Sequence, residues 1–239
     1  MPFTLAHPAA ILPLRWLLPG LPLVGLIIGA MVPDVLYFIA LRPTGTLGHT
    51  LPGVLLQGVP AGLILAGLWC NLMHAPMVRL LPAPLATRVP PPTPLRLPGV
   101  PKMAVAIALG ACTHLLWDGF THRTGFAVAR WPVLTETVGP LPLYSLLQHG
   151  CGVLGLLVLA GVAGLGLSRQ PVRSVSPHPR RGMLGVGLIL GSLGMTVWAA
   201  AGVDGVNAII VRGVIGAVSG LYLAALLTSV WIRLTTPKG

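Results

Sequence analysis

The chain alternates between long apolar runs and short polar connections. A helix needs about 20 mostly apolar residues to cross a hydrocarbon core roughly 30 Å thick. Runs of this kind lie at residues 51–73, 183–203 and 209–231. Residues 147–167 form a glycine-rich run, and residues 103–117 a shorter one. The pattern therefore predicts five membrane-spanning helices.

Residues 9–41 are apolar enough to span as well, but helix-breaking residues interrupt them. These are Pro13, Pro19, Gly20 and Pro22. Proline inside a helix costs about 3 kcal/mol through a lost hydrogen bond and a ring clash. We expect two short helices that meet near Pro19-Gly20, a broken or re-entrant hairpin. Irregular backbone at membrane depth must be buried in protein or face a wet cavity.

The polar connections divide the chain. Residues 74–102 contain nine prolines, which is typical of an extended linker. Residues 168–182 form a second, basic loop. We therefore predict a domain at residues 1–167, the loop, and a two-helix membrane hairpin at residues 183–239.

Glycines four residues apart in the last two runs predict close helix packing. The pairs are Gly187 with Gly191 and Gly216 with Gly220. Small residues at this spacing let two membrane helices approach closely.

Composition supports a membrane protein. Hydrophobic residues make up 54% of the 239-residue chain and charged residues only 8%, whereas soluble domains carry about 25% charged residues. The net charge of +11 does not indicate nucleic-acid binding, because the basic residues lie in loops between apolar runs. They are better interpreted as topology determinants and lipid headgroup contacts. The partner predicted is membrane lipid.

The basic residues also predict an orientation. Five spans place ten of them on one side: Arg79, Arg88, Arg96, Lys102, Arg169, Arg173, Arg180, Arg181, Arg233 and Lys238. The other side receives four: Arg15, Arg42, Arg123 and Arg130. Because the side richer in Lys and Arg is cytoplasmic, we expect a multi-pass protein of the bacterial cytoplasmic (inner) membrane. Its C-terminus would lie inside and its N-terminal region outside.

Most metal-capable side chains fall at the ends of apolar runs in the first 150 residues. They are His7, Asp34, His49, His114, Asp118, His122 and His149. His49 precedes the first span, His114 and Asp118 close the second, and His149 opens the third. Alternating helix direction brings them to one membrane face, opposite the basic loops. This convergence predicts a metal site on the extracytoplasmic face.

His114 and Asp118 are four residues apart, so on a helix they project from the same side. An imidazole and a carboxylate placed in this way can share a zinc ion or a similar divalent metal. The structural alternative is a His–Asp hydrogen bond that caps the helix end. A carboxylate near the membrane core costs about 2.5–3.5 kcal/mol on insertion scales. Asp34 and Asp118 therefore need a cation or a wet cavity.

Several motifs carry a family resemblance. They are Met1-Pro2-Phe3-Thr4-Leu5-Ala6-His7-Pro8, Val32-Pro33-Asp34, Gly48-His49-Thr50-Leu51-Pro52-Gly53, Thr113-His114-Leu115-Leu116-Trp117-Asp118-Gly119-Phe120-Thr121-His122 and Gln148-His149-Gly150. Over residues 1–160 or so the chain resembles a family of bacterial membrane proteins known only as a domain of unknown function. It is more distantly similar to membrane-bound metal-dependent hydrolases and to the all-helical zinc-dependent phospholipase C and nuclease fold.

The resemblance to the zinc fold implies a ligand set. His7, Asp34, His49, His122 and His149 match its zinc ligands in order, and His114 and Asp118 match its His-x-x-x-Asp helix. The glutamate that closes the pattern is replaced by Val153, and the N-terminal tryptophan ligand is missing. We therefore expect one or two zinc ions rather than three.

Two functions remain open. A metal-dependent hydrolase would attack a phosphodiester or an ester, such as a lipid-linked substrate, with a metal-activated water. Asp34 or Asp118 would hold that water or a metal. The alternative is a non-catalytic membrane protein with a structural His/Asp cluster. Ion transport is disfavoured, because a pathway of ionisable groups would have to continue across the membrane, and residues 55–70 and 153–167 are almost wholly apolar.

Overall fold

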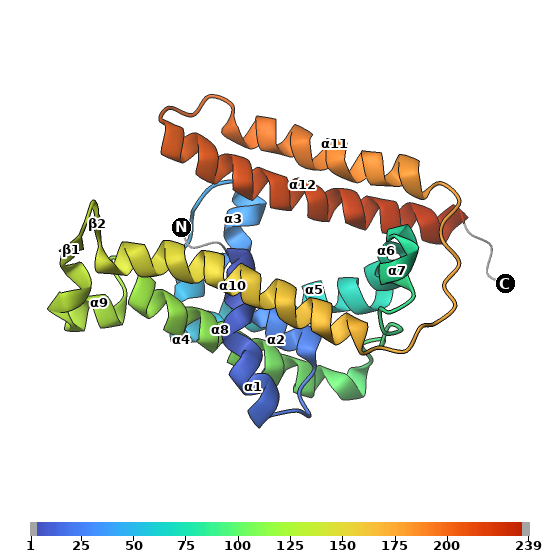
Figure 1. Cartoon of the computed structure of the whole chain (residues 1–239), viewed down its shortest axis with the longest axis horizontal. Helices are drawn as coiled ribbons and strands as arrows, with labels where there is room; N and C mark the ends of the chain where they lie inside the picture. Colours follow the sequence, from blue (N-terminus) through green and yellow to red (C-terminus); the bar gives the residue numbers. More distant parts are fainter. Residues whose placement is uncertain (1–3, 236–239) are drawn as a thin grey trace. The chain divides into compact units, whose positions relative to one another are not determined.

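A computed structural model describes residues 4–235 (Figure 1). The regular secondary structure of the described residues is helical apart from one short β-hairpin, and five helices are long and apolar enough to cross a membrane. The predicted fold class, an all-α polytopic membrane bundle with five spans, is confirmed. Residues 1–3 of the first motif and Lys238 lie outside the described residues.

The first span, Leu51–Leu80, is assembled from short helical segments. These are α4 (Leu51–Gly53), the π-helical η4 (Val54–Gly58), α5 (Val59–Leu68), the π-helical η5 (Trp69–Met73) and α6 (His74–Leu80). The span ends seven residues beyond residue 73, so the start of the predicted linker 74–102 is helical. A short helix, α7 (Ala83–Ala86), follows before the proline-rich stretch.

The other four spans are regular. The 3-10 turn η6 (Leu97–Gly99) leads into α8 (Val100–Thr121), and the remaining spans are α10 (Leu143–Ser168), α11 (Arg181–Ala200) and α12 (Val206–Thr235).

The N-terminal segment is broken, as predicted. It consists of the 3-10 helix η1 (Thr4–Ile11), α1 (Leu12–Leu17), α2 (Leu23–Gly29), the 3-10 turn η2 (Val32–Asp34) and α3 (Val35–Ala40). Helix α1 stops just before Pro19, because the residue before a proline is pushed out of helical geometry. The helical segments 23–29 and 32–40 are bent by 45° relative to each other. No straight helix joins residues 9 to 33 within this described segment.

Short elements complete the connections. The 3-10 turn η3 (Leu47–His49) precedes the first span, and α9 (Phe126–Arg130), the 3-10 turn η7 (Pro132–Thr135), β1 (Thr137–Val138) and β2 (Leu141–Pro142) lie between α8 and α10. The strands pair antiparallel, with Thr137 opposite Pro142. The turn between them contains Gly139 at a φ of 64°, a conformation that glycine adopts without strain.

The chain forms two compact units. The first comprises residues 1–35, 46–66 and 96–164, and the second comprises residues 36–45, 67–95 and 165–239. In the first unit, α2 packs directly on α8. A Cβ atom at Gly29 would collide with the backbone of Ile107, and one at Gly110 with the carbonyl of Leu26. Glycine at both positions therefore sets the separation of α2 and α8.

In the second unit, α11 packs along α12. A Cβ atom at Gly216 or Gly220 would meet the backbone of α11, and one at Gly191 would lie 2.9 Å from the Cβ of Ala224. The predicted close packing is thus confirmed for these three glycines. Gly187 faces open space and makes no such contact.

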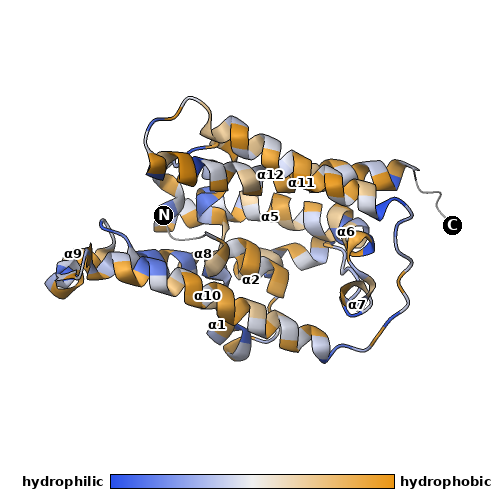
Figure 2. Ribbon diagram, turned by 45° about the horizontal axis from the view of Figure 1, so that its top comes forward, coloured by the Kyte–Doolittle hydropathy of each residue, from blue (hydrophilic) through white to orange (hydrophobic). Residues whose placement is uncertain are grey.

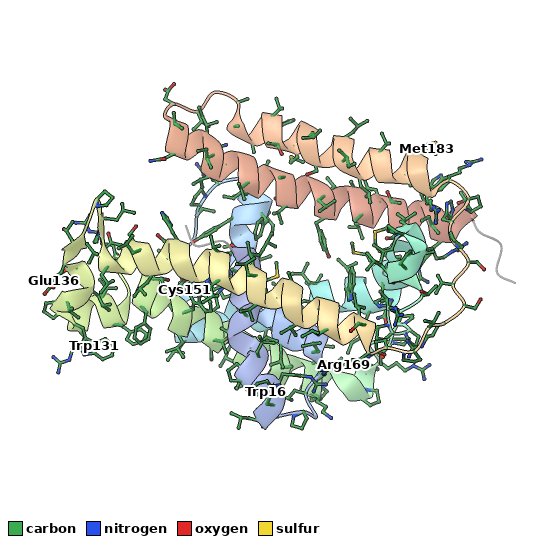
Figure 3. The ribbon with its side chains drawn as sticks, viewed as in Figure 1. Trp16, Trp131, Glu136, Cys151, Arg169 and Met183 are labelled. Carbon is green, nitrogen blue, oxygen red and sulfur yellow. The ribbon has the colours of Figure 1, made fainter. Side chains whose placement is uncertain are left out.

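The outer faces of the long helices are apolar. Figure 2 shows hydrophobic residues along the visible faces of α10 and α11. Only 11% of the α10 window and 6% of the α11 window are buried inside the protein. Figure 3 shows side chains such as Met183 on α11 projecting from the ribbon. Surfaces of this extent are stable only against lipid or another apolar surface.

Candidate metal centre

Helix α8 contributes two neighbouring polar side chains to the interior of the first unit. His114 and Asp118 lie one helical turn apart, with the Nε2 atom of His114 3.1 Å from Oδ2 of Asp118. His114 is completely buried, and the side chain of Asp118 is 12% exposed. The predicted i, i+4 pair is therefore formed and faces inward.

The broken N-terminal segment brings two further residues to this pair. His7, in η1, is completely buried, and its Nε2 atom lies 3.1 Å from Oδ1 of Asp118. Asp34 ends η2, and its Oδ1 atom lies 3.9 Å from Nε2 of His114. The breaks between α1 and α3 return the chain to the same depth, so both residues can reach one site.

His49 approaches from the turn before the first span. Its Nε2 atom lies 3.2 Å from Oδ1 of Asp34 and 3.5 Å from Oδ2 of Asp118. The next residue, Thr50, caps α4 by accepting a hydrogen bond from the backbone of Gly53. This cap fixes the turn that carries His49. The side chain of His49 is 25% exposed, so the cluster is open on this side.

The imidazole of His114 has a defined orientation. Its Nδ1 atom donates a hydrogen bond to the carbonyl oxygen of Ala30 at 2.8 Å. Its Nε2 atom is buried and has no hydrogen-bond partner among residues 4–235. The ring stacks on that of His7, with centroids 3.9 Å apart. A histidine that donates from one nitrogen presents the lone pair of the other nitrogen, the form that binds metals.

His122 lies at the edge of the cluster. Its Nδ1 atom is 3.1 Å from Oδ1 of Asp118, and its side chain is 31% exposed. The amide nitrogen of Gln148 lies 3.5 Å from Nε2 of His122. Oδ1 of Asp118 therefore faces His7 and His122, whereas Oδ2 faces His49 and His114.

The structure does not bring His149 to the cluster. Its side chain is exposed on α10, and within the described chain no hydrogen bond or ion pair joins it to the other predicted ligands. The preceding residue, Gln148, is buried and takes the place facing His122. Successive residues on a helix point about 100° apart, so the side chain one position earlier occupies the face predicted for His149.

Two further participants were not predicted. The hydroxyl of Thr4 donates to Oδ2 of Asp34 at 2.5 Å, and the Ala30 carbonyl orients His114. Thr4 lies three residues before His7 in the first motif, a spacing that places both on one side of a 3-10 helix. The spacing of Thr4 and His7 could therefore have identified Thr4 from the sequence. The role of a backbone carbonyl cannot be recognised from the residue type.

Two groups of side chains have metal-binding geometry. His7, His114 and Asp118 form one, and Asp34, His49 and His114 form the other, with the ligand atoms of each within 4.8 Å of one another. Burial lowers the pKa of His7, and its hydrogen bond to Asp118 opposes part of this effect. His7 therefore remains neutral, the state required of a ligand.

No curated protein and no solved structure matches this chain. One family does match, over residues 1–230, which reaches well beyond the residues 1–160 that carry the motifs. The comparisons show no similarity to hydrolases. The chain belongs to the DUF4184 family, which is defined by a domain of unknown function.

Proposed function

We propose that the cluster binds a divalent metal ion, most suitably zinc, and that the protein is a membrane-embedded metal-dependent hydrolase. The observation that carries the metal site is the environment of His114 Nε2. Because Nδ1 donates to Ala30, the Nε2 lone pair points toward the Asp118 and Asp34 carboxylates at 3.1 and 3.9 Å. A divalent cation bound between these electron-rich atoms would satisfy all three groups.

The spacing of four ligand atoms fits zinc. These are Nε2 of His49, Nε2 of His114, Oδ1 of Asp34 and Oδ2 of Asp118. Four of their separations are 3.1, 3.2, 3.5 and 3.9 Å. Ligands in a tetrahedron about 2.0–2.1 Å from zinc are about 3.3–3.5 Å apart. Shifts of a few tenths of an ångström would bring three of these four atoms onto one ion and leave the fourth position for water, as in catalytic zinc sites.

Charge supports the same proposal. Asp34 and Asp118 are 4% and 9% exposed, and both carboxylates lie within 3.5 Å of Nε2 of His49. Two buried carboxylates that share a neighbour in this way need a counter-charge. The stacked rings of His7 and His114 disfavour protonating both histidines instead, because like charges would then face each other. A divalent ion neutralises both carboxylates while leaving the imidazoles neutral.

The proposed hydrolase activity rests on the shape of the cluster. His7 and His114 close one side, whereas His49 and His122 are partly exposed on the other. When bound, the ion would supply a Lewis acid that activates water for attack on a phosphodiester or an ester. Asp34 or Asp118 would hold the ion or the water, and His122, whose Nδ1 atom lies 3.1 Å from Oδ1 of Asp118, lines the open side.

A lipid-linked substrate suits the surroundings. The open side adjoins exposed apolar side chains. They are Leu47 and Leu51, beside His49, and Leu116 on α8, which are 47%, 70% and 55% exposed. We further propose that the protein lies in the bacterial cytoplasmic membrane with its C-terminus inside. The loops on the side of the C-terminus are the richer in Lys and Arg, and such loops are cytoplasmic by the positive-inside rule. The cluster would then open on the extracytoplasmic face.

Metal analysis of the full chain, purified in detergent without chelators, tests the first step. We expect about one zinc per chain in wild type and in His149→Ala, and a loss of at least about tenfold in affinity for His114→Ala. Metal-free wild type that cannot be loaded with zinc would identify the cluster as structural.

Hydrolysis is tested separately, with zinc-loaded protein and chromogenic phosphodiester and ester substrates in mixed micelles. Turnover that disappears in Asp118→Asn and is retained in His149→Ala supports the hydrolase. Bound zinc without turnover of either substrate class would favour the non-catalytic alternative.

A further inference from the structure

The second unit contains a cluster of arginines that is separate in sequence from the metal ligands proposed above. Residues 169–180 connect α10 to α11, and we call them the basic strap. The strap contains Arg169, Arg173 and Arg180. Three more arginines of the same unit lie at its anchor points or ends: Arg79, Arg88 and Arg181.

Hydrogen bonds hold the strap against α6 and α7. The Nη1 atom of Arg88 donates to the carbonyls of Ser168 and Gln170 at 3.0 and 3.1 Å. The backbone N–H of Arg173 donates to Thr87, and that of His178 donates to Arg79. The strap is therefore an ordered segment with fixed arginine positions, although it contains no regular secondary structure.

Nearby carboxylates do not neutralise these arginines. Within residues 67–95 and 165–235, Asp204 is the one acidic residue. It precedes α12, whereas Trp231 and Arg233 lie near the end of that 30-residue helix. At 1.5 Å per residue the separation along the helix is on the order of 40 Å. The strap thus lacks an internal counter-charge in this described part of the unit.

Two arginines of the strap present groups that an anion could contact. The Nη1 atom of Arg173 is buried and lacks a hydrogen-bond partner among the described residues. The guanidinium of Arg180 lies 5.7 Å from the centre of the Trp231 ring, which also contacts His178. Burial, together with the charges of Arg79 and Arg180, lowers the pKa of His178. The charges of Arg79 and Arg180 thus both act on His178 within the strap and its anchor.

The arginines also mark the depth of the strap. Arg79 is the penultimate residue of the first span, Arg169 follows α10 directly, and Arg181 begins α11. These positions correspond to the boundary between hydrocarbon and water, where lipid phosphates lie. Arginine binds phosphate through a planar pair of N–H donors.

We propose that the basic strap is a binding site for the phosphate headgroup of an anionic phospholipid. Arg173 supplies the buried donor, and Arg180, held over Trp231, supplies the second cation. The ligand chemistry is that of a phosphate ester at the membrane surface, and the source to which we commit is lipid rather than free phosphate.

The test uses the full chain in neutral detergent, titrated with phosphatidylglycerol, phosphatidylcholine and inorganic phosphate and followed by native mass spectrometry. Wild type is expected to bind phosphatidylglycerol at least about tenfold more tightly than phosphatidylcholine. The double variant R173Q/R180Q should bind phosphatidylglycerol about thirtyfold more weakly than wild type. Each arginine lost near the membrane surface is expected to lower the affinity roughly fivefold. The control R42Q/R130Q removes the same charge from exposed positions outside the strap and should bind as wild type.

Equal affinity for the two lipids, or an unchanged affinity in R173Q/R180Q, overturns the proposal. Displacement of phosphatidylglycerol by an equal concentration of inorganic phosphate would identify a site for free phosphate and overturn the lipid assignment. If the double variant does not fold, Arg173→Gln alone leaves the contact of Arg180 with Trp231 in place and should weaken binding about fivefold.

Discussion

The Nδ1 atom of His114 lies 2.8 Å from the carbonyl oxygen of Ala30, which joins α8 to the end of α2. This contact fixes which nitrogen of His114 carries the proton and which faces the carboxylates. Loss of outer partners of this kind typically lowers metal affinity about 10–100-fold. The position of α2 against α8 should therefore control the metal centre.

Replacing Gly110 by alanine tests this dependence. The added Cβ would collide with the carbonyl of Leu26 and lie 2.9 Å from the backbone nitrogen of Ala30. We expect a loss of about 1–3 kcal/mol in stability and about tenfold or more in zinc affinity. Thermal unfolding and competition with a zinc indicator measure the two effects. As a control, Gly150→Ala adds a methyl group where no atom lies within 4 Å and should change neither.

Thr4 should be necessary for tight metal binding, because its hydroxyl holds Oδ2 of Asp34 and leaves Oδ1 for the metal. Thr4→Val keeps the shape but removes the donor, and we expect zinc affinity to fall about 10–100-fold. Thr4→Ser retains the hydroxyl and should bind zinc nearly as wild type. Equal affinity in the valine and serine variants would contradict the role assigned to the hydroxyl.

Asp34 and His149 should differ sharply, although sequence spacing predicted both as ligands. Asp34 is buried within 3.2 Å of His49 Nε2, whereas His149 is exposed. We expect Asp34→Asn to lower zinc affinity at least about tenfold and His149→Ala to leave it unchanged. Equilibrium dialysis against buffered zinc distinguishes the two. Zinc loss in His149→Ala would mean that α10 turns toward the cluster on binding.

His7 should make the metal-free protein sensitive to acid. Burial lowers the pKa of His7 in the folded state, so the unfolded chain, with an ordinary value of about 6.5, binds the proton more readily. Stability then falls as the pH drops below about 6.5. Thermal unfolding of chelator-treated protein between about pH 7 and pH 5 should show a smaller loss for His7→Gln than for wild type. A steeper loss in His7→Gln would reverse the expected sign.

The orientation of the chain can be tested with fusions. Ten basic residues on the side of the C-terminus predict a cytoplasmic C-terminus. A fluorescent protein that matures only in the cytoplasm should fluoresce when fused after residue 239, and an alkaline phosphatase fused there should be inactive. The same fusions placed between α11 and α12, near Asp204, should give the opposite pair of results. An active phosphatase at residue 239 would place the cluster on the cytoplasmic face.

The sequence by itself determined the membrane class, the five spans and the broken N-terminal segment. Length and hydropathy decide whether a helix can exist in lipid, and proline at positions 13, 19 and 22 breaks the backbone hydrogen bonds locally. Helix direction alternates from span to span, so the sequence also predicted that His49, His114 and Asp118 share one depth. Their contacts confirm that convergence.

Only the tertiary structure decided which side chains at that depth meet. A difference of one residue turns a helical side chain by about 100°, and the rotation of α10 is set by packing rather than by sequence spacing. This rotation turns Gln148 inward and leaves His149 exposed. The Ala30 carbonyl reaches His114 because glycines let α2 approach α8. A backbone atom has no residue type, so its role appears only once the chain has folded.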